Sequence, residues 1–250
     1  MAFLRPAVTK LDHIVLASRN VEKTCEAFYK LTGCKPTFGG SHVNRGTKNY
    51  LVNIGEDKYL EFIGLDYAQN VEEIVRKGGS KAIPFGVYDL REAESKIVTF
   101  ACVTSRLKET ASAASWVGLP FSMSRKTPEG NTLNWSLAVH ESGATTKYSS
   151  IYPFLIDWET VYKQNLHPAK TSPTGCRLVS LLVEAQDPDK YIADLNHAGI
   201  GKGIFCCGVV SVCKAESCDK DRLLVVLDTP KGIVTLSDNM LNNLATVGNM

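Results

Sequence analysis

The feature that most constrains the fold of this chain is a pattern that occurs three times, at intervals of roughly 80 residues: an extended apolar run, an amphipathic helical run and then a glycine. It spans residues 11–36, 96–121 and 176–203. A polar side chain that can cap a helix stands before each helical run, and the glycine favours the left-handed backbone that terminates a helix. The predicted N-caps are Asn20, Ser105 and Asp187, and the predicted terminating glycines are Gly33, Gly118 and Gly199.

Short extended runs separated by turn residues follow each glycine, so each unit is predicted to be β-α-β-β-β. Such a unit makes a curved sheet with a helix on its outer face, and two units side by side make a cup with a concave face. We therefore predict an α+β fold in which two modules form a cup and a third module packs beside it. The predicted boundaries are a domain over 10–158 (modules 10–65 and 97–158, insertion 66–96), a linker over 159–175 and a third module over 176–240.

The composition is that of an ordinary globular protein, and it excludes several classes of function. Of the 250 residues, 44% are hydrophobic and 22% are charged, and the formal net charge is +2, so no strong field favours nucleic acid or an anionic membrane as a partner. No apolar run approaches the roughly 20 residues that span a bilayer, and the N-terminal apolar patch is too short for a signal peptide. We therefore expect a cytoplasmic protein whose cysteines are reduced.

Half of the eight cysteines are crowded into one segment. Cys206, Cys207, Cys213 and Cys218 lack the C-x-x-C spacing that is typical of zinc sites. We interpret them as small apolar side chains of a strand over 202–212 and of the loop that follows it.

Two polar residues are predicted to share the concave face of the cup. Side chains alternate between the two faces of a strand, and the helix of the first unit must pack on one of these faces. This leaves His13 of the first strand and Glu61 of the last strand on the opposite, concave face. A polar pair on an otherwise apolar face is a candidate chemical site. The predicted bed of the helix consists of Ile14, Leu16, Leu60 and Phe62.

The segment GGSHVNRGTKN, at 39–49, is rich in glycine and in side chains that form hydrogen bonds. Its two glycines permit close approach of another backbone, and His42 follows them directly after Ser41. We interpret this segment as a rim that binds a substrate. The predicted substrate-binding residues are Arg45, Thr47 and Asn49 of the rim, with Asn134 and Trp135 of the strand at 131–139.

Together these segments resemble the glyoxalase-like branch of the vicinal oxygen chelate superfamily. The resemblance rests on LDHIVLA, GGSHVNRGTKN, KYLEFIGL, KTPEGNTLNWSLAV, YPFLIDW and the following pair His167-Pro168, and it covers most of residues 10–170 and extends more weakly to about residue 240. It implies a cup of paired β-α-β-β-β modules and, in many members, a divalent metal held by histidines and carboxylates. Members include lyases, isomerases, extradiol dioxygenases, epimerases, thiol transferases and metal-free binding proteins, so the fold leaves the reaction open.

The resemblance implies metal ligands at His13 and Glu61. The paired module departs from the pattern, because Thr99 stands opposite His13 and apolar residues at 154–155 stand opposite Glu61. Adding His42 would complete a two-histidine, one-carboxylate set for Zn, Fe, Mn or Ni, so chemistry with and without a divalent metal both remain open. The other histidines, His140, His167 and His197, are expected at surface or linker positions.

Three functions follow from the residues and the resemblance. The first is a metal-assisted lyase or isomerase that acts on a carbonyl or hydroxylated metabolite, with Glu61 and His42 as catalytic residues. The second is an extradiol-type dioxygenase, and the third is a non-catalytic protein that binds a small ligand. Without a metal, Glu61 could act as a base and His13 or His42 as an acid. The expected partner is a small molecule, and the odd number of modules leaves one free to pair across a homodimer.

Overall fold

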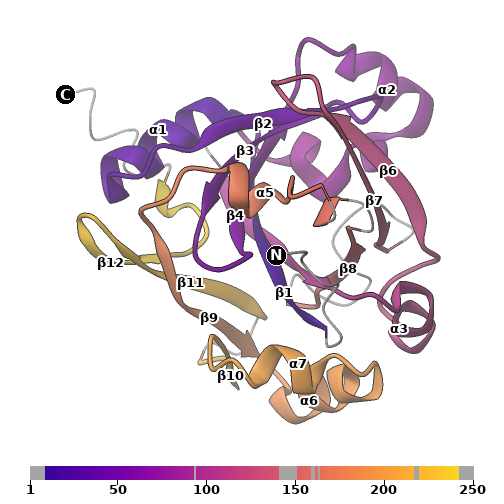
Figure 1. Cartoon of the computed structure of the whole chain (residues 1–250), viewed down its shortest axis with the longest axis vertical. Helices are drawn as coiled ribbons and strands as arrows, with labels where there is room; N and C mark the ends of the chain where they lie inside the picture. Colours follow the sequence, from indigo (N-terminus) through magenta and orange to yellow (C-terminus); the bar gives the residue numbers. More distant parts are fainter. Residues whose placement is uncertain are drawn as a thin grey trace.

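The computed structural model has the predicted α+β architecture, with a large curled sheet that forms a cup and a smaller sheet beside it (Figure 1). It describes residues 9–92, 94–140, 151–158, 161–162, 164–216 and 220–241. The first unit consists of β1 (Lys10–Ser18), α1 (Val21–Thr32), β2 (Thr37–His42), β3 (Thr47–Asn53) and β4 (Tyr59–Leu65). As predicted, the side chain of Asn20 caps α1, and Gly33 ends the helix in the left-handed conformation with φ 79°.

The second unit repeats this order and joins the first in one eight-stranded sheet. It consists of β5 (Ser95–Val103), α3 (Leu107–Ala113), β6 (Phe121–Lys126), β7 (Thr132–Ala138) and β8 (Phe154–Asp157). The strand order is β2-β3-β4-β1-β5-β8-β7-β6, with β1 and β5 antiparallel at the centre. The helix ends differ from the prediction, because Arg106 instead of Ser105 holds the N-cap position and α3 ends well before Gly118.

The two outer strands, β2 and β6, approach each other and nearly close the cup. The guanidinium of Arg125 on β6 donates a hydrogen bond to the backbone oxygen of Gly39 on β2. A Cβ at Gly40 would lie 2.6 Å from the backbone oxygen of Lys126 and 2.9 Å from Nη1 of Arg125, so a side chain there would force the strands apart. The glycine pair therefore permits the close approach that the sequence predicts.

The two faces of the large sheet belong to separate apolar cores. On the convex face, Ile14 and Phe62 pack with Phe28 of α1, so the predicted bed of the helix is confirmed. Val15 and Ile63 belong to a second core on the concave face. Side chains of β1 and β4 therefore alternate between the convex core and the inside of the cup, and the polar residues His13 and Glu61 lie on the inside.

The insertion at 66–96 adds a further wall to the cup. It forms α2 (Val71–Gly78) and two short 3-10 turns, Ser80–Ala82 and Pro84–Asp89. Phe85 has φ 58°, a left-handed conformation that costs about 1–3 kcal/mol for a residue other than glycine. Its ring lies 5.7 Å from the ring of Phe154, so this backbone conformation brings an aromatic side chain to the concave face.

The third unit keeps the predicted order of elements but orders its strands differently. Its sheet runs β10-β9-β11-β12, so the first strand lies inside the sheet. In the cup modules the first strand stands at the module's edge and joins the two modules, whereas here β10 occupies that edge. Asp187 caps α6 as predicted, and Gly199 follows the end of α6 with φ 71°. The elements are β9 (Arg177–Ala185), α6 (Pro188–His197), α7 (Gly201–Phe205), β10 (Val210–Lys214), β11 (Arg222–Thr229) and β12 (Gly232–Leu236).

This third unit, orange to yellow in Figure 1, packs against the convex side of the cup. Leu181 and Leu227 share one apolar core with Phe100 of β5. The backbone N–H of Leu178 donates to the oxygen of Ile54 at 2.7 Å, which ties β9 to the first module. The third unit therefore covers the outside of the cup and leaves the concave face to the cavity.

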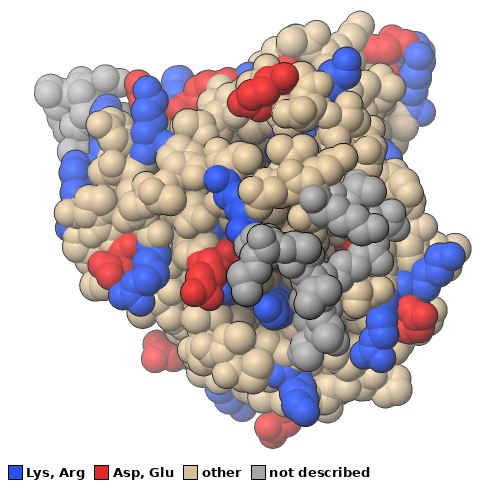
Figure 2. Space-filling view, viewed as in Figure 1, with Lys and Arg blue, Asp and Glu red and all other residues tan. Residues whose placement is uncertain are grey.

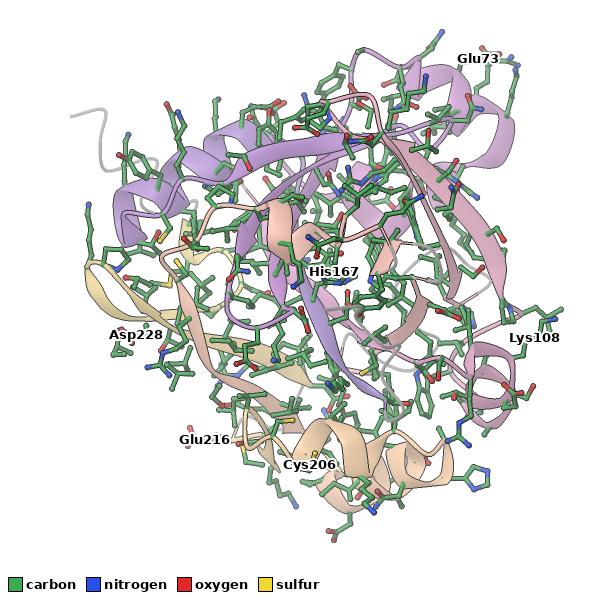
Figure 3. All side chains as sticks on the ribbon, in the orientation of Figure 1. Glu73, Lys108, His167, Cys206, Glu216 and Asp228 are labelled. Carbon is green, nitrogen blue, oxygen red and sulfur yellow. The ribbon has the colours of Figure 1, made fainter. Side chains whose placement is uncertain are left out.

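The cysteine-rich segment is a strand only in its second part, where β10 contains Cys213. Ile200 and Ile204, four residues apart, both face the convex core, and this helical spacing produces α7 where the strand was expected to begin. Cys206, labelled in Figure 3, and Cys207 lie exposed in the turn after α7, and Cys213 on β10 is exposed as well. Of these three, only Cys213 lies in a strand, and Cys218 lies outside the described residues.

Charged side chains are spread over the surface. Lys and Arg alternate with Asp and Glu on the face shown in Figure 2, in keeping with the small net charge. In the described part of the chain, no helix is long and apolar enough to cross a membrane.

Candidate active site

A cavity of about 130 Å³ lies inside the cup, between the strands of the two modules and the insertion. Its wall is largely aromatic, with Phe85, Phe121, Trp135, Phe154 and Trp158. The polar side chains that reach it are His13, His42, Arg45, Asn49, Tyr59, Glu61, Lys81 and Arg125. An apolar cavity with a few convergent polar groups is typical of a small-molecule site.

His13 and Glu61 meet inside this cavity, on the face that the alternation predicts. Nε2 of His13 lies 3.4 Å from Oε2 of Glu61, and both side chains are buried. The imidazole stacks on the ring of Tyr59 at 4.5 Å and meets the edge of Phe154 at 5.3 Å. These two rings fix the plane of the imidazole, so its Nε2 stays directed at the carboxylate.

Asp12 holds the other side of the His13 ring, with Oδ1 2.6 Å from Nδ1. Adjacent strand residues normally face opposite sides, but a break in register between Leu11 and His13 brings these two side chains together. Burial alone would raise the pKa of Asp12, but His167 and His13 outweigh it and hold the pKa well below its usual value. An ionised Asp12 accepts the Nδ1–H of His13 and leaves Nε2 to face the cavity.

His167 is a second histidine on the same carboxylate. Its Nε2 lies 3.1 Å from Oδ2 of Asp12, and the indole N–H of Trp158 donates to that oxygen at 3.0 Å. The expectation of a surface or linker position is wrong, because His167 is fully buried and lies in the middle of the molecule beside α5 (Pro168–Thr171; Figure 3). Its Nδ1 accepts the backbone N–H of Ala169 at the start of α5, and this bond orients the ring toward Asp12.

His42 approaches Glu61 from the rim segment. Its Nε2 lies 4.0 Å from Oε1 of Glu61, and its Nδ1 lies 3.0 Å from the hydroxyl of Thr47. Asn49 donates a side-chain N–H to the same Oε1 at 2.7 Å. Burial lowers the pKa of His42 to about 4, against the opposing charge of Glu61 and with the help of nearby guanidinium groups. His42 is therefore neutral at pH 7.

This shifted pKa predicts a loss of stability in mild acid. The unfolded chain binds a proton at His42 near the ordinary value of 6.5, whereas the folded protein binds it only near 4, so acid favours the unfolded state between these values. Acidification from pH 7 to 5 is expected to lower the free energy of unfolding by about 2 kcal/mol, measured by urea denaturation. His42→Asn should remove this acid-induced loss of stability. The exposed His197 at the end of α6 is the control, and His197→Asn should show the same loss as wild type. The explanation fails if wild type and His42→Asn lose equal stability.

Two guanidinium groups reach the cavity from opposite modules. Arg125 is only 5% exposed, and burial lowers its pKa. It donates to the backbone oxygen of Gly39 and forms no ion pair with a carboxylate of the described residues. Arg45 is exposed, and its guanidinium lies 5.7 Å from the ring centre of Phe121. The cavity therefore contains one buried cation, Arg125, and has two exposed cations, Arg45 and Lys81, at its edge.

The predicted site residues fall into two groups in the structure. Thr47 is fully buried behind His42 and does not line the cavity. Asn134 is exposed and also lies outside the cavity wall, because it faces the opposite side of β7 from Trp135. The predicted residues that do line the cavity are His13, His42, Arg45, Asn49, Glu61 and Trp135.

Several site residues were not predicted from the sequence. The sequence did contain a usable signal for Arg125. Phe121, Met123 and Arg125 stand two residues apart along β6, which is the period of one strand face, and all three line the cavity. Asp12 had no such signal, because strict alternation assigns it to the convex face. The residues missed are Asp12, Tyr59, Arg125, Trp158 and His167.

The donors in the cavity do not fit the divalent metal that the resemblance implies. Nε2 of His13 and Nε2 of His42 both face Glu61, which is how a two-histidine, one-carboxylate set begins. Yet within the ranges that the structure describes, no three or more His, Cys, Asp or Glu side chains are arranged to hold a metal ion. Where further ligands would be needed, the second module supplies Phe154 and the buried cation Arg125, which repels a dication.

One solved structure shares the fold over most of this chain, and others are similar to it more weakly. A hypothetical protein from Staphylococcus aureus is similar over 92% of this chain and 86% of its own, with 16% identity and a TM-score of 0.57. Methylmalonyl-CoA epimerase from Mycobacterium tuberculosis is similar over 62% of this chain and 91% of its own, with 16% identity and a TM-score of 0.37. A mutant of 4-hydroxymandelate synthase from Streptomyces coelicolor is similar over 92% and 63%, with 12% identity and a TM-score of 0.46. At 16% identity, the likeness to the Staphylococcus aureus protein concerns the fold alone.

A search of curated proteins returned no match to this sequence. The sequence model of the glyoxalase-like domain family matches residues 11–199, which include both modules of the cup and every residue that lines the cavity. The matched segment also extends through α6 of the third unit. The chain therefore belongs to the glyoxalase-like domain family.

Proposed function

We propose that this protein is an enzyme that transfers a proton at a carbon atom beside a carbonyl group of a small metabolite, as isomerases and lyases do. One observation carries the proposal: the carboxylate of Glu61 and the imidazole of His13 lie 3.4 Å apart inside a largely apolar cavity. General acid–base catalysis needs two such groups within reach of one another and of the substrate. Membership of the family supports a small-molecule function and leaves the reaction open.

Glu61 is the base in this proposal. The N–H of Asn49 donates to Oε1 and fixes the carboxylate, which leaves Oε2 to take the proton from the substrate carbon. The electron pair of the broken C–H bond moves onto the carbonyl oxygen of the substrate. Return of the proton to a different face or a different carbon completes an isomerisation, and loss of a neighbouring leaving group completes an elimination.

The two histidines beside Glu61 have different roles. Asp12 accepts the Nδ1–H of His13, so Nε2 is the atom that exchanges a proton with Glu61 or the substrate. A side-chain N–H of Asn49 lies 3.5 Å from Nε2 of His42 and donates to it, so the neutral ring carries its proton on Nδ1 and donates to the hydroxyl of Thr47 at 3.0 Å. His42 is neutral at pH 7 and, with Asn49, helps to position Oε1 of Glu61.

Metal-assisted catalysis and extradiol oxygenation are not part of the proposal, because the donor set does not fit a metal ion. A non-catalytic protein that binds a small ligand would have a similar cavity. Deuterium exchange separates this alternative from the enzyme, because it reports proton removal even when no product accumulates.

The test incubates wild-type protein in deuterated water with a panel of α-keto acids, hydroxyketones and β-keto acids. Proton NMR follows the loss of the C–H signal beside each carbonyl group. Exchange faster than in buffer alone, for at least one compound class, is the expected result. Compounds that bind, as shown by ligand-observed NMR, but never exchange faster than in buffer would overturn the proposal in favour of a binding protein.

A further inference from the structure

We propose that the substrate carries a single carboxylate and that Arg125 binds it, opposite the carbon that Glu61 deprotonates. The inference names the substrate class of the proposed function and rests on it for the reaction, but the binding site itself is argued from the cavity. It commits to a monocarboxylate with a flat or compact apolar body.

Arg125 places a buried positive charge at the wall of the cavity. This side chain is 95% buried and lines the cavity. Among the described residues, it donates a hydrogen bond only to the backbone oxygen of Gly39. A guanidinium carries five N–H donors in a planar fork that matches a carboxylate. A buried charge without a counterion is costly, and proteins normally pair it. Glu61 and Glu129 act on Arg125 electrostatically, but no carboxylate of the described residues contacts its guanidinium, so its remaining N–H donors are a preformed anion site.

Arg125 and Glu61 stand on different sides of the cavity. The strand of Arg125, β6, stands across the cavity from β4, which carries Glu61, and the two charges act on one another. Because residue 40 is a glycine, β2 lies close enough to β6 for the guanidinium of Arg125 to contact it. Any side chain at position 40 would displace this guanidinium. A bound molecule can thus place an anionic group at Arg125 and a reacting carbon at Glu61.

The cavity wall also suits the uncharged part of such a ligand. The cavity that holds these two groups is also lined by the aromatic rings of Trp135, Trp158 and Phe154. These rings suit an apolar body and exclude water from the charge pair. A monocarboxylate adds one negative charge to a cavity that already holds Arg125 and Glu61, whereas a phosphate dianion adds two and is repelled more strongly by Glu61. The chemistry therefore favours a carboxylate over a phosphate.

The experiment compares benzoate with benzamide, which has a similar shape but no charge. Binding is measured by quenching of the fluorescence of Trp135 and Trp158, which line the cavity, and by the shift in unfolding temperature. Wild type is expected to bind benzoate about tenfold or more tightly than benzamide. Arg125→Met should lose this preference, and Arg91→Met, an exposed site, should retain it.

The free Arg125→Met variant is expected to unfold at the same or a higher temperature than wild type, because it removes an unpaired buried charge. Should this variant not fold, Arg125→Lys keeps the charge but loses the planar fork, and it should reduce the preference for benzoate. Equal binding of benzoate and benzamide by wild type, or an undiminished preference in the Arg125 variants, would overturn the proposal. Tighter binding of phenyl phosphate than of benzoate would overturn the carboxylate assignment.

Glu61→Gln separates this inference from the proposed reaction. Removing a negative charge from the cavity should leave benzoate binding unchanged or stronger, while deuterium exchange is lost. If the protein binds benzoate more tightly than benzamide but catalyses deuterium exchange in no compound, the anion site stands and the proposed reaction is refuted. The reverse pattern, exchange without discrimination, would refute the anion site alone.

Discussion

Glu61→Gln is expected to slow the deuterium exchange catalysed by this protein about a thousandfold, within the range that general bases contribute. Glutamine has the shape of glutamate but cannot accept a proton from carbon. Its oxygen can still accept the N–H of Asn49, and its own N–H can donate to Nε2 of His13. The variant should therefore fold normally, and the loss should appear in the rate of exchange measured by proton NMR.

Glu56→Gln is the matched control, because Glu56 is exposed on the turn before β4. It makes the same chemical change away from the cavity and should exchange at the wild-type rate. A Glu61→Gln variant that keeps more than about one tenth of the wild-type rate would contradict the role of Glu61 as the base.

Asp12→Asn is expected to lower the free energy of unfolding by about 3 kcal/mol and also to slow exchange. Donor atoms of His13, Trp158 and His167 surround this buried carboxylate at 2.6–3.1 Å. An asparagine presents an N–H to one of these donors and leaves it without an acceptor. It also permits Nδ1 of His13 to become the acceptor, which moves the ring proton to Nε2 and removes the lone pair that receives protons.

The two effects need separate measurements, namely urea denaturation for stability and NMR exchange for activity. Asp228→Asn is the control, because Asp228 forms an exposed pair with Arg177 and should cost less than about 1 kcal/mol. Asp12→Asn with the stability of this control, or with wild-type exchange, would refute the role assigned to Asp12.

The sequence predicts the faces of the cup well because they depend on local periodicity. The apolar positions of β1 and β4 that pack on α1 place His13 and Glu61 inside the cup, and the structure has them 3.4 Å apart. The helix start at Asn20 and its end at Gly33 depend on neighbouring backbone groups only. Such features need no knowledge of distant parts of the chain.

The features that were missed depend on irregularity or on tertiary contact. Asp12 reaches His13 through a break in the register of β1, which alternation cannot predict. His167 lies in a segment that has the composition of a linker, yet it is buried by contacts with residues more than a hundred positions away. The strand order of the third unit is likewise set by which strand pairs with β9, and the order of elements along the chain does not determine this.

The burial of Arg125 has a similar cause. Its strand has the alternating pattern of one sheet face, but the contact with Gly39 forms only when the outer strands of two modules meet. The metal expectation also came from one module alone. The second module contributes Phe154 and Arg125 to the cavity, at places where further metal ligands would be needed.

The most direct test of the central claim, proton transfer by Glu61 and His13 without a metal, is deuterium exchange by metal-stripped wild-type protein. The protein is treated with a chelator, its metal content is measured by elemental analysis, and exchange is followed before and after addition of Zn, Fe, Mn or Ni. The account predicts that the stripped protein exchanges at the untreated rate and that no metal increases it. Exchange that disappears on stripping and returns with one of these metals would contradict the account.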